Sequence, residues 1–137
     1  MDAERMRQTS DDELAVRSVQ AASVIELSEG IEIRELTRGR LGSLAHCTVR
    51  PGAVSHAAMH KNFEELWYVL AGDGQLWLRC DQEEYTTELR PGLTLAIPVA
   101  AHFQFRNRGP LPLEFVIASV PPFPGAQQVG SVAGPWT

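Results

Sequence analysis

The chain has 137 residues, of which 44% are hydrophobic and 21% charged, and its formal net charge is −5. These values are typical of one soluble globular domain with its own core. The acidic balance, without a basic cluster, argues against nucleic acid or an anionic membrane as a partner. The longest apolar stretch, residues 93–101, is too short to cross a bilayer. The N-terminal residues lack the apolar run of a secretory signal, so we expect a cytoplasmic protein.

The N-terminal segment, residues 1–30, is predicted to be an arm or a short helix. Ser10 to Glu13 match a capping box, and apolar residues follow at helical spacing as far as Ala22. This pattern favours a helix that ends near Ala22, and an irregular start is the alternative. A first strand is expected over residues 24–27.

From Ile31 onward the pattern changes to short runs of strand-forming residues separated by turn residues such as Pro51-Gly52 and Pro91-Gly92. Strands at this regular spacing, without helical patterns between them, predict an all-β antiparallel sandwich or barrel over residues 31–120. Residues 121–137 are rich in proline and glycine, and we expect an extended arm laid along an apolar surface. The predicted strands are 32–36, 41–49, 54–60, 64–71, 75–79, 85–89, 94–97, 102–106 and 113–119.

Residues 64–71 form the strongest predicted strand. A period of two places Glu65 and Trp67 on one face and Leu66 and Tyr68 on the other. Both faces are largely apolar, so we expect this strand to be covered on both sides. The glycines of residues 72–74 predict a tight hairpin at its end.

The segment that precedes this strand carries three residues of interest on one face, His56, Ala58 and His60. If the two segments pair, His60 and Glu65 point into one cavity. An imidazole and a carboxylate suit iron, manganese, nickel or zinc. They also suit proton transfer, because a neighbouring carboxylate raises the pKa of a histidine and fixes its tautomer. A hydrogen-bonded pair without a ligand is the simpler alternative.

One motif of this chain contains Gly52, His60, Glu65 and Gly72, and a second contains Gly92, Pro98 and Asn107. The spacing of these residues resembles that of the two cupin family motifs, and the likeness covers about residues 33–119. The resemblance implies a small antiparallel jelly-roll barrel with a site in its mouth.

This chain departs from the cupin pattern at two of the positions that hold metal ligands. Metal-binding cupins take two histidines and a glutamate from the first motif and one histidine from the second, but here Ala58 and Phe103 hold two of those positions. His102 lies one residue out of phase and points away from the cavity unless a bulge rotates it inward. The resemblance therefore implies either no cofactor or a weakly bound divalent metal (zinc, nickel, manganese or iron). Its ligands would be His60 and Glu65, with His56 and His102 as further candidates.

The pocket itself is expected to be lined by Ala58, Trp67, Phe103 and Phe105, although aromatic residues in strands are more often core, and core is favoured for Phe105. We expect a small-molecule ligand. The first hypothesis is an enzyme acting on a small polar or aromatic molecule with His60 and Glu65 as catalytic residues. Its chemistry would be that of an isomerase, epimerase or cyclase, or of a dioxygenase if metal is bound.

Two further functions stay open from the sequence. One is a non-catalytic pocket that binds a small ligand for sensing or storage, and the other is a structural accessory subunit. We also expect a homodimer, because a strand with two apolar faces and an arm carrying Phe123 and Trp136 present more apolar surface than a small monomer exposes. Cys47 and Cys80 are interpreted as free buried thiols, with a disulfide as the alternative.

Overall fold

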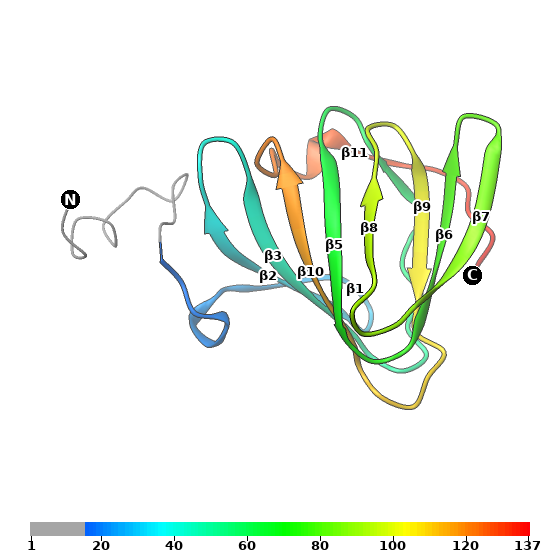
Figure 1. Ribbon diagram of the computed structural model, residues 1–137, viewed down its shortest axis with the longest axis horizontal. Coiled ribbons are helices and arrows are strands. Elements are labelled where there is room, and N and C mark those ends of the chain that lie inside the picture. The colour runs from blue at the N-terminus through cyan, green and yellow to red at the C-terminus, as the bar shows by residue number, and fades with distance from the viewer. Residues whose placement is uncertain (1–15) are drawn as a thin grey trace.

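The computed structural model describes residues 16–137 and consists of β-strands in two sheets that curve around a common interior (Figure 1). Two short 3-10 helices, η1 (Val19–Ala21) and η2 (Ala126–Gln128), lie near the ends of the described chain. The strands are β1 (Val24–Ser28), β2 (Ile31–Arg38), β3 (Ser43–Val49), β4 (Ala58–His60), β5 (Glu64–Ala71), β6 (Gly74–Cys80), β7 (Glu83–Leu89), β8 (Thr94–Ile97), β9 (His102–Arg106), β10 (Leu113–Val120) and β11 (Val129–Ser131).

The two sheets have the order β1-β2-β3-β10-β5-β8 and β11-β4-β9-β6-β7. All pairings between neighbouring strands are antiparallel. Strands distant in the sequence lie side by side, as β10 does between β3 and β5. The predicted antiparallel jelly-roll barrel is confirmed.

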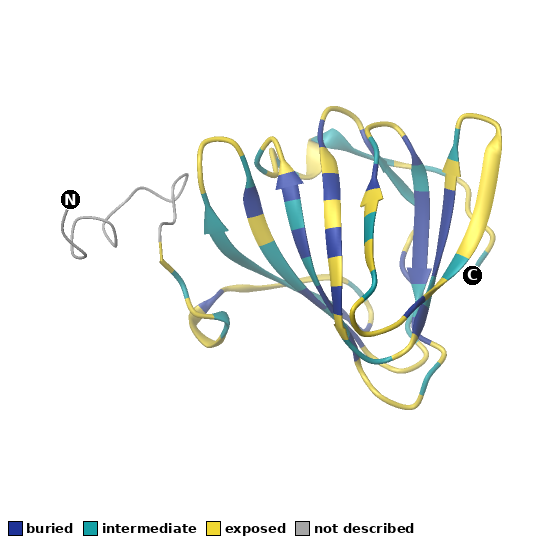
Figure 2. Cartoon of the chain, in the orientation of Figure 1, coloured by how far each residue is buried: buried dark blue, intermediate teal, exposed yellow. Residues whose placement is uncertain are grey.

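The core fills the space between the sheets and is built from alternate residues of each strand. Figure 2 shows the alternation along β5, where Glu65 and Trp67 are buried while Leu66, Tyr68 and Leu70 face outward. The outer three are 46%, 50% and 45% exposed. The predicted division of faces is confirmed, but within residues 16–137 nothing covers the outer face of β5, so the expected cover on both sides is not found in the described part of the single chain.

The prediction of a tight hairpin at residues 72–74 is wrong. The strands that this turn joins, β5 and β6, belong to different sheets, so the turn carries the chain from one sheet to the other. Gly72 has φ +91°, and a Cβ there would meet the carbonyl oxygen of Pro112 and the Cα of Leu113. The glycines therefore indicated a sharp turn with a close backbone approach. They could not show whether the two strands that the turn joins pair with each other.

The strand predicted over residues 54–60 is shorter than expected. Only Ala58–His60 form β4, and Val54 makes one isolated bridge to Arg106. Between them, the hydroxyl of Ser55 accepts a hydrogen bond from the backbone N–H of Phe105 at 2.9 Å. This side-chain bond takes the place of a regular ladder contact.

The predicted N-terminal helix begins outside the described residues, and its second half, residues 16–22, is not an α-helix. Within residues 16–22 there is one 3-10 turn, η1, in which the hydroxyl of Ser18 accepts from the N–H of Ala21 at 3.2 Å. Val24 and Ile25 are β-branched and favour extended backbone, and they begin β1, which pairs with β2. No helix in residues 16–137 has the length and apolarity needed to cross a membrane.

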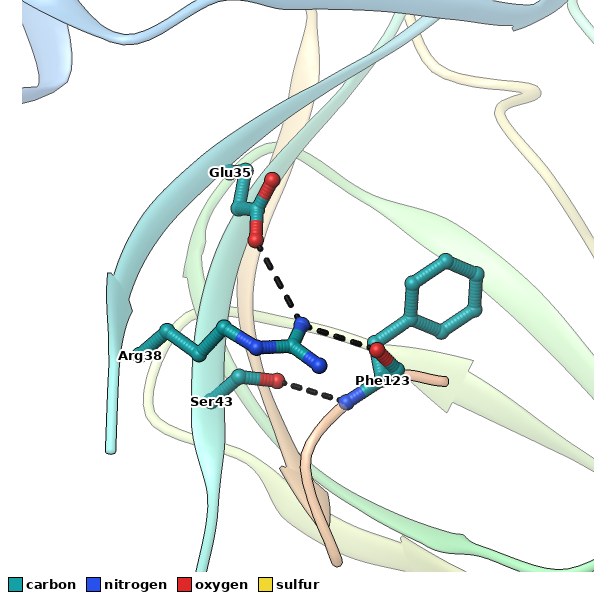
Figure 3. A network of polar contacts seen from close by, with 4 residues as sticks. All are labelled: Glu35, Arg38, Ser43 and Phe123. Carbon is teal, nitrogen blue, oxygen red and sulfur yellow. Dashed lines mark hydrogen bonds and ion pairs between the residues drawn. The ribbon is translucent and has the colours of Figure 1, made fainter. Parts of the chain in front are cut away.

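The C-terminal segment runs back across the barrel and is held at two places. At its start, Arg38 Nη1 donates to the carbonyl oxygen of Phe123 at 2.8 Å, and the Phe123 N–H donates to Ser43 Oγ at 2.9 Å (Figure 3). Glu35 Oε1 lies 3.6 Å from the same Arg38 nitrogen. At its far end, Trp136 exchanges two hydrogen bonds with the buried side chain of Gln104.

Between these two anchors the arm adds β11 to the edge strand β4. The ring of Trp136 also packs beneath Arg106, whose guanidinium carbon lies 4.0 Å from the ring centroid. Cys47 and Cys80 are free thiols, the first buried and the second half-buried.

Candidate functional site

A cavity of about 260 Å³ opens between the two sheets and is largely apolar. One wall comes from β1 and β2, and another comes from the segment that leads into β4. Phe103 and Phe105 of β9 form the back of the cavity. The arm supplies a further wall with Phe123 and β11, so segments from early and late in the described chain meet here.

His60 and Glu65 lie together in this cavity, as their spacing predicted. They come from β4 and β5, which belong to different sheets. His60 Nε2 lies 3.6 Å from Glu65 Oε2, and the two residues are only 4% and 7% exposed. The geometry brings an imidazole and a carboxyl group together away from bulk water.

Aromatic residues hold both members of this pair. The indole N–H of Trp67 donates to Glu65 Oε1 at 2.9 Å. The imidazole of His60 stacks on Phe63, with centroids 4.2 Å apart, and tilts against Phe103 at 4.8 Å. His60 Nδ1 is buried and has no hydrogen-bond partner among the described residues.

Burial controls the ionisation of the pair. It raises the pKa of Glu65 to about 7, although the hydrogen bond from Trp67 opposes the shift. It lowers the pKa of His60 to about 4. The expectation that the carboxylate raises the pKa of this histidine is therefore wrong, because loss of solvation outweighs attraction. At neutral pH His60 is uncharged and Glu65 is divided between its two protonation states.

The other residues predicted for the site are placed as follows. Ala58, Phe103 and Phe105 line the cavity, and Phe105 also belongs to the core. Trp67 is not a wall of the cavity, because its indole lies in the core, stacked on Phe115 at 4.1 Å. It reaches the site through its bond to Glu65.

The two further histidines differ in position. His56 lines the cavity at an exposed place on its rim. His102 is paired with Met59 and does not line the cavity, while its neighbour Phe103 is paired with Ala58. The regular pairing of β4 with β9 leaves no bulge to turn His102 inward.

Several site residues were missed from the sequence. Ser28 of β1 lines the cavity beside Ile33 of β2, and its buried Oγ has no hydrogen-bond partner among the described residues. The β1–β2 ladder shifts register between Glu26 and Ser28. The arm was expected to follow an apolar surface, but nothing in its composition showed that this surface is the cavity.

The cupin domain family matches residues 45–119 of the chain, which is more than half of its length. The chain belongs to the cupin family. It is 33% identical to an uncharacterised protein of Methanocaldococcus jannaschii over 100 residues, which cover 69% of this chain and 77% of that protein. It is 34% identical over 71 residues to the alginate biosynthesis protein AlgA of Pseudomonas putida, covering 52% of this chain and 14% of AlgA.

Among solved structures, this cupin is similar in fold to two larger proteins. Oxalate decarboxylase of Bacillus subtilis aligns with a TM-score of 0.71 and 23% identity, over 83% of this chain and 31% of that chain. CapF of Staphylococcus aureus, a capsular polysaccharide assembling protein, aligns with a TM-score of 0.71 and 15% identity, over 82% and 35%. This cupin thus spans about a third of each structure that it resembles.

A catalytic divalent metal does not fit the donors present in this cupin. Catalytic metal sites generally use three protein ligands, whereas His60 and Glu65 supply two. Residues 16–137 contain no group of three histidine, cysteine, aspartate or glutamate side chains placed to hold an ion. Ala58 and Phe103, which have no donor atoms, face the same space.

Proposed function

We propose that this cupin binds a small molecule in its barrel cavity and catalyses proton transfer on it, as an isomerase or epimerase does. Glu65 is the acid–base group and His60 is its neighbour in the site. The observation that carries this proposal is a buried carboxyl group in an apolar cavity whose pKa is about 7. A general acid or base works best when its pKa lies near the working pH.

The surroundings of Glu65 support the same role. Trp67 fixes one carboxyl oxygen at 2.9 Å, and the other lies 3.6 Å from the uncharged imidazole of His60. One oxygen is therefore oriented by the core while the other remains available to a ligand. Cyclase chemistry would draw on the same carboxyl group.

Deuterium exchange tests this proposal. In D2O, we expect the wild type to exchange the acidic C–H protons of at least one compound in a panel of small carbonyl compounds, followed by NMR. Glu65→Gln should slow the exchange by a factor on the order of 100 or more, because it removes the proton-transfer group. Glu64→Gln is the matched control, since Glu64 is the exposed neighbour on the same strand. Equal exchange by both variants would contradict the role of Glu65.

The alternative function is non-catalytic binding of a small ligand for sensing or storage. The apolar walls of the cavity favour it, because such walls stabilise a bound ligand without any chemistry. Binding in the cavity with no exchange by the wild type on any compound would favour this alternative over catalysis.

We also propose that this cupin forms a homodimer through the outer face of the sheet that contains β5. The strand pairings place Leu44, Ala118, Leu66 and Ala96 in one row across four neighbouring strands. Tyr68 extends the row at the next outward position, and Leu44, Leu66 and Tyr68 are exposed in the single chain. A continuous apolar face of this kind is typical of a surface that a partner covers.

Light scattering tests the dimer. We expect the wild type to have the mass of two chains at micromolar concentration, and Leu66→Glu to have the mass of one, because a charge on the row would be buried without a partner. Tyr85→Glu is the control, since Tyr85 is 55% exposed but lies on the other sheet. A monomeric wild type, or equal loss of dimer in both variants, would overturn the proposed interface.

A further inference from the structure

We infer that the cavity selects an uncharged ligand with one ring and one short polar group, such as an amide or ketone, and rejects the matching carboxylate. This inference rests on the proposed small-molecule site and specifies the class of its ligand. Three features of the cavity carry it: the charges on its walls, the hydrogen-bonding capacity of Glu65 and its size.

The charges on the walls disfavour an anion. Among the described residues that line the cavity there is no lysine or arginine. Glu65 is the one carboxyl group, and the neutral imidazole of His60 offers no positive charge to balance it. His56 lies on the exposed rim. A carboxylate that entered would lose its solvation next to a group of like charge, which is costly unless one of the two takes up a proton.

The carboxyl group of Glu65 favours a neutral ligand that can hydrogen-bond. When protonated it has one O–H to donate, and when ionised it accepts. An amide both donates and accepts, and so matches Glu65 in either state. His60 Nδ1 and Ser28 Oγ are buried without accessible surface, so they lie outside the reach of a ligand in the cavity.

The size of the cavity suits a ligand with one ring. A buried apolar cavity of about 150 Å³ already accepts benzene, and this cavity has about 260 Å³. The additional space accommodates one short substituent. Phe103, Phe105 and Ile117 supply apolar and aromatic surface against which a ring can pack.

Benzamide and benzoate are the probes that test this inference, since they have nearly the same shape and differ in charge. In titration calorimetry at about pH 8, where Glu65 is largely ionised, we expect benzamide to bind at millimolar concentration or better and benzoate at least about tenfold more weakly. Glu65→Gln should strengthen benzoate binding relative to benzamide, because it removes the like charge while keeping the shape.

Equal or tighter binding of benzoate, or no binding of either probe at millimolar concentration, would overturn the inference. Either result leaves the proton-transfer proposal to the deuterium-exchange assay, whose panel is not restricted to these probes.

Discussion

The double substitution Ala58→His/Phe103→His is expected to convert the cavity into a divalent-metal site. Ala58 and Phe103 are paired across β4 and β9 and face the same space as His60 and Glu65. Two histidines there raise the donor count from two to four without a new backbone conformation. We expect nickel or zinc affinity to increase by orders of magnitude. At a metal concentration of a hundred times Kd, native stability should rise by about 2.7 kcal/mol.

Thermal unfolding with and without added nickel is the measurement. Ala58→Val/Phe103→Leu is the control, because it also changes the volume at both positions but adds no donor. The wild type and this control should show little rise in Tm. A wild type that purifies with one tightly held ion per chain would contradict the expectation, and His56 would then be the third ligand, because it lines the same cavity.

Glu65→Gln and His60→Asn should change the pH dependence of stability in opposite directions. In the unfolded chain the pKa values are about 6.5 for His60 and 4.5 for Glu65, whereas in the native protein they are about 4 and about 7. Between pH 4.5 and 6.5 the native pair holds its one proton on Glu65, and the unfolded pair holds its one proton on His60. Equal proton numbers mean that the wild-type pair contributes little slope in this window.

Each substitution reveals how the remaining group makes the free energy of unfolding depend on pH. Without Glu65, the unfolded state binds one proton more than the native state between pH 4 and 6.5, so stability rises with pH. Without His60, the native state binds one proton more between pH 4.5 and 7, so stability falls as pH rises. Each slope, relative to wild type, approaches about 1.4 kcal/mol per pH unit.

Urea unfolding of the three proteins at several pH values between these limits measures the slopes. Taking each variant relative to wild type cancels the contribution of the other titrating groups. If the free energy of unfolding changes with pH in the same way in all three proteins, His60 and Glu65 are not both uncharged in the native state. The role of Glu65 as a proton donor near pH 7 would then lose its basis.

The fold was predictable because its strongest signals are local. Strands β5, β8 and β9 begin and end where residue types and turns placed them. The turn at residues 72–74 shows the limit of such signals, because a glycine-rich turn looks the same whether it joins two strands of one sheet or crosses between sheets. Sheet order depends on contacts that are distant in the sequence.

The candidate site was predictable in part for the same reason. His60, Glu65, Ala58 and Phe103 follow strand periodicity, which places a side chain on one face or the other. The pKa of His60 was not predictable, because the sequence shows a neighbouring carboxylate but not the depth of burial, and burial dominates here. Ser28 and β11 reach the cavity only through tertiary packing.

Early and late segments of the sequence both form walls of the cavity, which limits the order in which the site can form. A protein is synthesised from its N-terminus, and the barrel strands as far as β10 leave the ribosome before the arm does. A nascent chain that has reached residue 120 contains His60, Glu65 and Ser28, but lacks the wall formed by Phe123 and β11. The cavity therefore gains this wall only when residues 123–131 have emerged, and a ligand that needs the wall does not bind a chain interrupted before them.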